Sequence, residues 1–242
     1  MSKIKESIKS VFRSLGIDIK LHDSKRTDVG MIVTILNNLD INMVFDVGAN
    51  CGQYASGIIK LGYNGRIVSF EPLSAAHAKL RSLAKSYVQW EVHDRCAIGN
   101  DNCQVEINIS RNSESSSLLP MLSSHVEAAP SSKYVAREVT RLFKLDGLSK
   151  NYIDQNTKLY IKIDTQGFEW NVLDGASDCL HLAKAVQIEL SFVSLYESQH
   201  LWREIVERME VLGFDLWLLL PGFSNYEIGR TLQMDAVFVR HD

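Results

Sequence analysis

The residues with the clearest chemical potential are a glycine turn and an acidic residue that follows it. The turn runs from Gly48 to Gly52 (GANCG) and follows a short apolar run at residues 43–47, while Glu71 lies farther along. A glycine turn that opens a helix, with an acid roughly 20 residues on, is the layout of a nucleoside pocket whose acid accepts the ribose hydroxyls. We therefore predict that Gly48, Asn50, Gly52 and Glu71 contact a nucleoside.

The composition of this turn separates two kinds of nucleoside ligand. A dinucleotide places its pyrophosphate over the helix N-terminus and favours G-x-G-x-x-G, which this turn lacks. S-adenosylmethionine has no phosphate and carries a sulfonium and an ammonium group, to which a carboxylate at Asp46 is suited. We predict S-adenosylmethionine as the ligand and keep NAD as the alternative. A purely structural interpretation, in which Asp46 and the glycines only shape the turn, remains open.

Two further acids end or lie near the end of predicted strands. Asp164 follows the run LYIKI, and Glu189 lies in the run VQIEL. The carboxyl ends of parallel strands share one edge of a sheet, which is where ligands bind. We predict Asp164 as a catalytic base and Glu189 as a second candidate, although Asp164 could instead only cap the next helix. Together with Asp235 they could hold Mg²⁺, but no spacing requires a metal, so we predict a site without one.

Two more candidates come from loops. Asp94 follows an alternating strand at residues 88–92 and is placed to contact an adenine amino group, unless the loop is simply solvated. His125 lies in an irregular serine-rich loop at residues 111–132, which we interpret as a lid or substrate loop because loops of this length in compact domains are usually functional. A lone loop histidine is more often a bystander than a base, and His125 is retained as the third catalytic candidate.

Hydrophobic periodicity predicts the elements that position these residues. Short apolar runs alternate with segments of helical spacing, which indicates an α/β fold with a doubly wound, mostly parallel sheet and helices on both faces. The predicted strands cover residues 43–47, 67–70, 88–92, 104–110, 159–164 and 186–190, and the predicted helices cover 28–39, 53–61, 74–86 and 201–212. Residues 214–220 and 233–240 flank Pro221-Gly222 and predict a closing antiparallel hairpin.

The first segment differs in character from the rest of the chain. Apolar residues recur there at helical spacing, with lysines on the other side: Ile4, Ile8, Val11, Phe12 and Leu15. We predict a helical extension at residues 1–40 and a catalytic domain at residues 41–242. The apolar stripe is expected to cover the sheet or a subunit contact in a homo-oligomer. The alternative is contact of residues 1–15 with a membrane surface.

Composition excludes several classes of partner. A formal net charge of -3, from 26 basic and 29 acidic residues, gives no electrostatic footprint for nucleic acid. The four cysteines show neither a C-x-x-C pair nor metal spacing, so we expect reduced thiols in a cytoplasmic protein. No apolar run reaches the ~18 residues of a transmembrane span. A small-molecule or glycan acceptor is the expected partner.

With these motifs in view, the chain resembles the FkbM-type S-adenosylmethionine-dependent methyltransferases. The resemblance covers residues 44–239 and rests on VFDVGANCGQYA at 44–55, SFEP at 69–72, SSSL at 115–118 and, above all, IKIDTQGFEWNVLDGA at 161–176. Gln166 stands where the family more often has a glutamate. The resemblance implies a Rossmann-like methyltransferase fold and methylation of a hydroxyl, usually on a sugar or on a glycosylated or polyketide natural product.

The predicted reaction is an in-line displacement that mainly requires alignment of acceptor, methyl group and sulfur, with a carboxylate taking the hydroxyl proton. Two other classes remain as alternatives. A nicotinamide-dependent oxidoreductase would use the same fold, but the chain lacks G-x-G-x-x-G and an obvious tyrosine-lysine or histidine relay. A non-catalytic S-adenosylmethionine-binding module would keep Asp46, Gly48 and Glu71 and lack an acceptor site.

Overall fold

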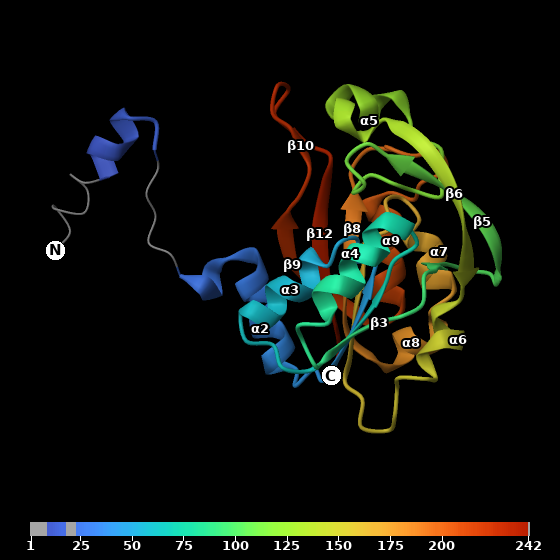
Figure 1. Cartoon of the computed structure of the whole chain (residues 1–242). Helices are drawn as coiled ribbons and strands as arrows, with labels where there is room; N and C mark the ends of the chain where they lie inside the picture. Colours follow the sequence, from blue (N-terminus) through green and yellow to red (C-terminus); the bar gives the residue numbers. More distant parts are fainter. Residues whose placement is uncertain (1–8, 18–22, 242) are drawn as a thin grey trace, which may run out of the picture.

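A seven-stranded sheet in the order β3-β2-β1-β7-β8-β12-β9 organises the protein (Figure 1). The computed structural model describes residues 9–17 and 23–241. Five strands run parallel: β1 (Met43–Val47), β2 (Arg66–Phe70), β3 (Trp90–Val92), β7 (Leu159–Ile163) and β8 (Ala183–Ser191). The strands β9 (Phe214–Pro221) and β12 (Gln233–Arg240) are antiparallel, β12 pairing with both β8 and β9. The predicted mostly parallel sheet with a C-terminal antiparallel hairpin is confirmed.

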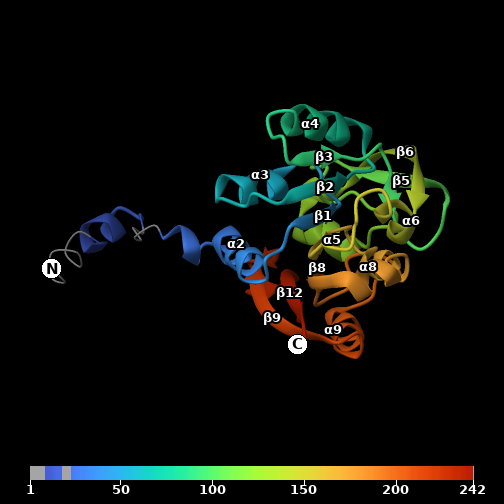
Figure 2. The ribbon, with the colours of Figure 1, turned by 90° about the horizontal axis from the view of Figure 1, so that it is seen from below.

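Helices cover both faces of this sheet, as predicted. On one face lie α2 (Asp28–Asn38), α3 (Gln53–Lys60) and α4 (Ser74–Ala84), and on the other lie α6 (Leu145–Ser149), α7 (Glu169–Asp174), α8 (Ser177–Leu182) and α9 (Trp202–Val211). Figure 2 shows α2 and α3 on one side of the strands and α8 and α9 on the other. The chain winds outward from β1 to β3 and then returns to β7 on the other side of β1. This reversal between β1 and β7 creates a crevice at their carboxyl ends.

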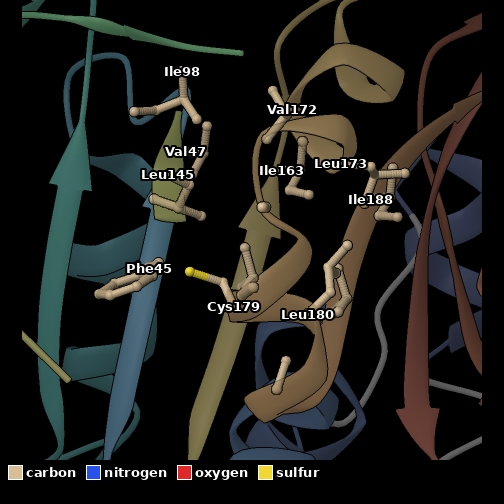
Figure 3. Close-up of a cluster of buried hydrophobic side chains, with 14 of the residues drawn as sticks. Phe45, Val47, Ile98, Leu145, Ile163, Val172, Leu173, Cys179, Leu180 and Ile188 are labelled. Atoms are coloured by element: carbon tan, nitrogen blue, oxygen red, sulfur yellow. The ribbon is translucent and has the colours of Figure 1, made fainter. Parts of the chain in front are cut away.

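A dense apolar core fixes the three central strands relative to one another. Figure 3 shows Phe45 and Ile163 from the sheet facing Val172, Leu173 and Leu180 from the helices α7 and α8. None of these five side chains is more than 2% exposed. Burial of one such side chain stabilises the fold by about 1.5–3 kcal/mol. The carboxyl ends of β1, β7 and β8 are therefore held by packing that is independent of the polar residues beyond them.

A second sheet and a long loop lie between β3 and β7 in the chain. The sheet has the order β4-β6-β5 and consists of β4 (Ala97–Ile98), β5 (Cys103–Ser110) and β6 (Tyr134–Phe143). The connection between β5 and β6 contains α5 (Ser123–Ala128) and η2 (Pro130–Ser132). The side-chain amide of Asn108 donates to the carbonyl oxygens of Ser117 (3.1 Å) and Leu119 (3.3 Å), which ties this connection to β5. The remaining short elements are η1 (Ser24–Arg26), β10 (Ser224–Asn225) and β11 (Arg230–Thr231).

The N-terminal region differs from the predicted division at residue 40. The helix α2, capped by the hydroxyl of Thr27, buries Ile32 and Leu36 against the sheet, so it belongs to the domain core. Residues 9–14 are helical, and Val11 and Leu15 are 61% and 69% exposed, so this part of the apolar stripe does not cover the sheet. Ile4 and Ile8 lie outside the described residues. In the described ranges, no helix has the length and apolar character needed to cross a membrane.

The turn after β1 gives a test of the close approach between β1 and β7. Gly48 has φ +78°, and a Cβ atom there would overlap the carbonyl oxygen of Asp164. Gly62 has φ +101° with no described atom within 4 Å of a built Cβ, so Gly62→Ala is the matched control. Left-handed strain should cost both variants about 1–2 kcal/mol. Overlap should cost Gly48→Ala a further ~2 kcal/mol or more in free energy of unfolding.

Urea denaturation followed by circular dichroism measures both losses. If Gly48→Ala and Gly62→Ala lose equal free energy of unfolding, the turn after β1 is not in close contact with the turn after β7.

Candidate functional site

A cavity of about 400 Å³ opens at the carboxyl edge of the sheet, and we call it the main cavity. It lies where the chain reverses between β1 and β7, which is the expected position of a ligand in a doubly wound sheet. Polar side chains come from the turns after β1, β2 and β7, from the strands β7, β8 and β12 themselves, and from the loop at residues 113–118. The polar residues that line it are Asn50, Gln53, Tyr54, Glu71, Ser113, Glu114, Ser116, Ser117, Lys162, Asp164, Thr165, Gln166, Gln187, Glu189 and Asp235.

One wall of the main cavity is the glycine turn at residues 48–52, whose backbone is hydrogen-bonded to the side chain of Glu71. The backbone N–H of Asn50 donates to Oε2 of Glu71 (2.7 Å), and the N–H of Leu73 donates to Oε1 (2.8 Å). Burial raises the pKa of Glu71 to about 7. Gly48, Asn50 and Glu71 all line the cavity, as the sequence indicates. Gly52 instead lies behind the turn, where it begins α3 with φ +90° and packs close to Trp90, so it shapes the turn and does not face the cavity.

Asp46, which the sequence predicts to face the ligand's ammonium, is not among the residues that line the main cavity. Its side chain is fully buried and accepts a hydrogen bond from the hydroxyl of Ser69 (3.0 Å). The ammonium of Lys162 lies 3.7 Å from Asp46 and 3.2 Å from Asp164, and it donates to the carbonyl oxygen of Gly48 (3.3 Å). Asp46 thus faces a cation of the protein itself and positions Lys162.

Burial and the neighbouring charges shift the pKa values of Asp46 and Lys162 in opposite directions. Burial raises the pKa of Asp46, and the nearby Lys162 ammonium partly offsets that rise. Burial lowers the pKa of Lys162, but the carboxylates of Asp164 and Asp46 outweigh it, so the pKa of Lys162 lies above its usual value. Lys162 therefore remains charged although it is only 5% exposed.

Asp164 and Glu189 meet at the cavity, as predicted from the strand ends. Gln166 joins them: its Nε2 donates to Oδ1 of Asp164 (2.9 Å) and to Oε2 of Glu189 (2.8 Å), and its Oε1 accepts from the hydroxyl of Tyr196 (2.9 Å). Burial, with the neighbouring charges of Asp164 and Glu169, raises the pKa of Glu189 well above its usual range. The side chain of Asp164 is 34% exposed and is the open carboxylate of the pair.

Sequence reasoning did not find the role of Gln166. Its backbone adopts a left-handed conformation with φ +54°, which directs the amide between the two acids. The only sequence signal is its place between Asp164 and Gly167, where the family it resembles more often has a glutamate. Tyr54 was also missed as a lining residue; its hydroxyl is buried with no hydrogen-bond partner in the part of the chain that the structure describes.

Asp94 is exposed and does not line the main cavity, which differs from the predicted contact with adenine. The strand β3 ends at Val92, and the chain then turns inward, so that Cys96, Ala97 and Ile98 form this wall. Around these residues the lining is apolar and includes the aromatic side chains of Phe70 and Phe168, so a heterocycle here would pack on aliphatic and aromatic groups.

The acids at the edge of the sheet are paired with polar and charged groups of the protein. Across residues 9–17 and 23–241, no group of three His, Cys, Asp or Glu side chains is arranged to bind a metal ion. Asp235 lies opposite Glu189 in the β12–β8 pairing and lines the cavity. The carboxylates are bound instead by Lys162, Gln166 and Gln233, whose Nε2 lies 2.6 Å from Oε2 of Glu189.

His125 lies apart from Asp164, in a second cavity of about 200 Å³ that we call the His125 cavity. Its side chain is 2% exposed, and burial lowers its pKa to about 4. An imidazole with so low a pKa is neutral at pH 7 and is a weak base. The two cavities share three lining residues, Glu114, Gln166 and Glu189.

Comparison with known proteins identifies what this chain is similar to. Residues 46–216 match the sequence model of the methyltransferase FkbM domain, and no curated protein matches the chain. The methyltransferase FkbM of Methylobacillus flagellatus KT has a TM-score of 0.50 at 16% identity; the match covers 81% of this chain, and this chain spans 44% of that protein. The magnesium protoporphyrin IX methyltransferase of Synechocystis PCC 6803, solved with bound SAM, has a TM-score of 0.49 at 11% identity, with 98% and 97% covered. At 16% identity the likeness to the Methylobacillus flagellatus structure concerns the fold alone, which is Rossmann-like as predicted.

A buried acid beside the site makes stability depend on pH in a way that can be tested. Oε1 of Glu169 accepts from the N–H groups of Thr165 (3.0 Å) and Gly167 (3.1 Å), and burial raises the pKa of Glu169 to about 7. The folded state thus binds this proton more tightly than the unfolded state. The resulting stability is present at low pH and is lost as pH rises from about 4.5 to about 7. Glu169→Gln keeps the accepting oxygen and removes the titration.

We expect the free energy of unfolding of Glu169→Gln, relative to wild type, to rise by on the order of 2 kcal/mol between pH 5 and pH 8. Urea denaturation at several pH values measures this difference, with the exposed Glu210→Gln on α9 as the control. Parallel pH profiles for wild type and Glu169→Gln would contradict the assigned titration.

Proposed function

Because this chain belongs to the family of FkbM-domain methyltransferases, we propose that it transfers a methyl group from S-adenosylmethionine to a hydroxyl of a sugar, a glycoside or a related natural product. The observation that carries the proposal is the carboxylate of Asp164. It is partly exposed at the main cavity and is held on one oxygen by Gln166 and on the other by Lys162. A fixed carboxylate at this edge is suited to take a proton from an acceptor hydroxyl.

The residues of the main cavity fit the donor. S-adenosylmethionine supplies a methyl group activated by its sulfonium. Oδ1 of Asn50 and the hydroxyl of Tyr54 are buried without a partner among the described residues, and both residues line the cavity. Unpaired buried polar atoms are costly, and the hydroxyl and ammonium groups of the donor would satisfy them. Each oxygen of Glu71 holds one N–H and retains a lone pair for a ribose hydroxyl.

The acceptor must be aligned with the methyl group and must lose its hydroxyl proton. Asp164 is the proposed base, and Lys162 and Gln166 are positioning residues because they act through Asp164. Glu189 and His125, the other two candidates, are less suited to proton abstraction: the amides of Gln166 and Gln233 already donate to the carboxyl group of Glu189, and burial makes His125 a weak base. The family membership leaves the nicotinamide-dependent alternative without support. We further propose that the enzyme works in the reducing cytoplasm, which its four free cysteines support.

The role of Asp164 is tested by Asp164→Asn. The amide keeps the shape of the side chain and removes the basic oxygen, so we expect methyl transfer to fall by about 10²–10⁴-fold. Binding of S-adenosylhomocysteine should stay within about threefold of wild type, because Asp164 is assigned to the acceptor. Asp101→Asn, at an exposed turn remote from the cavity lining, is the matched control and should behave as wild type.

Transfer of radiolabelled methyl groups to a panel of sugars and glycosides measures the rate, and calorimetry measures S-adenosylhomocysteine binding. A near-normal rate for Asp164→Asn would remove Asp164 as the base. A wild-type protein that binds S-adenosylhomocysteine and methylates no hydroxyl would favour the non-catalytic module.

A further inference from the structure

Two groups of large apolar side chains are exposed outside the linings of both cavities. The first belongs to the N-terminal segment at residues 9–17, which lies apart from the body of the domain in both Figure 1 and Figure 2. Four of its nine residues are apolar and exposed: Val11, Phe12, Leu15 and Ile17. Apolar side chains that are exposed as a group mark an interaction surface.

Backbone hydrogen bonds define the end of the helix in this segment. The N–H of Gly16 donates to the carbonyl oxygen of Arg13 (3.0 Å), and the N–H of Ile17 donates to that of Phe12 (2.9 Å). This pair of bonds is the Schellman motif of a helix C-terminus. The segment is thus a helix with a defined end, and Ile17 is hydrogen-bonded to its last turn.

The N-terminal segment is amphipathic and positively charged. Phe12 and Val11 lie three and four residues before Leu15, a spacing that puts the three side chains on one face of a helix. The charged residues of the segment are Lys9 and Arg13, and both are basic. A surface that receives this helix must therefore be apolar at its centre and acidic at its rim.

The second group of exposed apolar side chains, which we call the edge patch, lies along β9 and the arm that joins β9 to β12. β9 is the last strand of the seven-stranded sheet, and the arm extends beyond the sheet at β10 (Figure 1). The edge patch consists of Leu216, Trp217, Leu219, Tyr226 and Ile228. The charged residues at positions 210–231 are all exposed, and three of the four are acidic: Glu210, Asp215, Glu227 and Arg230.

The edge patch is suited to side-chain packing and not to the addition of another strand. Leu216 and Leu218 lie opposite consecutive residues of β12, so Trp217 between them forms a bulge. Pro221 at the end of β9 has no backbone N–H group. Bulges and prolines on an edge strand hinder its pairing with a further strand. An amphipathic helix instead binds through its apolar face and requires no backbone pairing.

Each chain carries both halves of such a contact, since the N-terminal segment is basic and the surroundings of the edge patch are mostly acidic. We propose that two copies of this chain form a twofold-symmetric dimer, in which the N-terminal segment of each copy packs on the edge patch of the other. Symmetry then makes the same contact twice. At their exposed fractions the nine apolar side chains present on the order of 1,000 Å² per chain, against the about 800 Å² that each partner buries in a stable interface.

Analytical ultracentrifugation of the full chain at micromolar concentration tests the dimer. The helix variant carries Val11→Asp with Leu15→Asp, and the patch variant carries Trp217→Asp with Leu219→Asp. Each variant places charges on one of the two apolar surfaces. We expect wild type to be a dimer, and we expect each variant to raise the dissociation constant of the dimer at least tenfold.

The matched control is Val88→Asp with Val135→Asp, at two exposed apolar residues outside both surfaces, and it should dimerise as wild type does. Every changed side chain is exposed, so all variants should keep the circular dichroism spectrum of wild type. Mixing the helix variant with the patch variant tests the exchange between copies. One copy then supplies an intact edge patch and the other an intact helix, so mixed dimers should be at least fivefold tighter than those of either variant alone.

Three outcomes would overturn the proposal. The first is a monomeric wild type, and cosedimentation of that monomer with phosphatidylglycerol vesicles would assign the N-terminal segment to a membrane surface instead. The second is a helix variant that dimerises as tightly as wild type, since the copies would then associate through another surface such as the edge of β9. The third is weak association of both variants with no recovery in their mixture, because the segment would then not pack on the other copy's edge patch.

Discussion

The site depends on one buried positive charge, the ammonium of Lys162. It lies between Asp46 and Asp164 and also holds the carbonyl of Gly48, so it joins the turn after β1 to the turn after β7. A buried charge is tolerated only when it is well paired, because its desolvation costs several kcal/mol. The carboxylates of Asp46 and Asp164 supply that pairing. Without Lys162, these two carboxylates would lie close together with no positive charge between them. The close packing of Gly48 against Asp164 then fixes the edge of the main cavity.

This charge also separates the roles of the acids around it. Glu71 and Glu169 are buried and Glu189 is partly buried, and loss of hydration raises the pKa of each. Asp164 is the partly exposed acid that contacts Lys162 directly. Acids in unlike environments can perform unlike tasks within one site. The neutral amide of Gln166 donates hydrogen bonds to both Asp164 and Glu189 and so keeps the two acids in place. A carboxylate at this position would repel them.

Much of this arrangement follows from the sequence, because strand ends in a doubly wound sheet share an edge. Glu71, Asp164 and Glu189 could be placed at the cavity by that rule alone. The same rule does not show which way the side chain of Asp46 points. All five residues of β1 are buried, so the strand has no alternation of buried and exposed residues that would indicate which side chains face the crevice. The position of Asp94 away from the cavity lining could not be predicted either, because tertiary packing sets the direction of the chain after the short strand β3.

The second cavity depends on a chain path that the sequence pattern does not encode. His125 approaches Gln166 and Glu189 only because the 111–132 connection folds back over the sheet edge, and no periodicity encodes that path. The left-handed backbone of Gln166 is equally invisible in a residue that seldom adopts it. The predicted boundary at residue 40 separated α2 from the domain because an amphipathic helix alone does not indicate which surface its apolar face covers.

S-adenosylmethionine is the proposed ligand of the main cavity. Calorimetric titration of the purified protein with S-adenosylmethionine, S-adenosylhomocysteine and NAD tests it directly, with Glu71→Ala as the site variant and the exposed Glu91→Ala on β3 as its control. We expect both sulfur ligands to bind at one site per chain, NAD not to bind, and the affinity for the sulfur ligands to fall at least tenfold in Glu71→Ala but not in Glu91→Ala. Binding of NAD without either sulfur ligand, or equal affinities for S-adenosylhomocysteine in Glu71→Ala and Glu91→Ala, would contradict it.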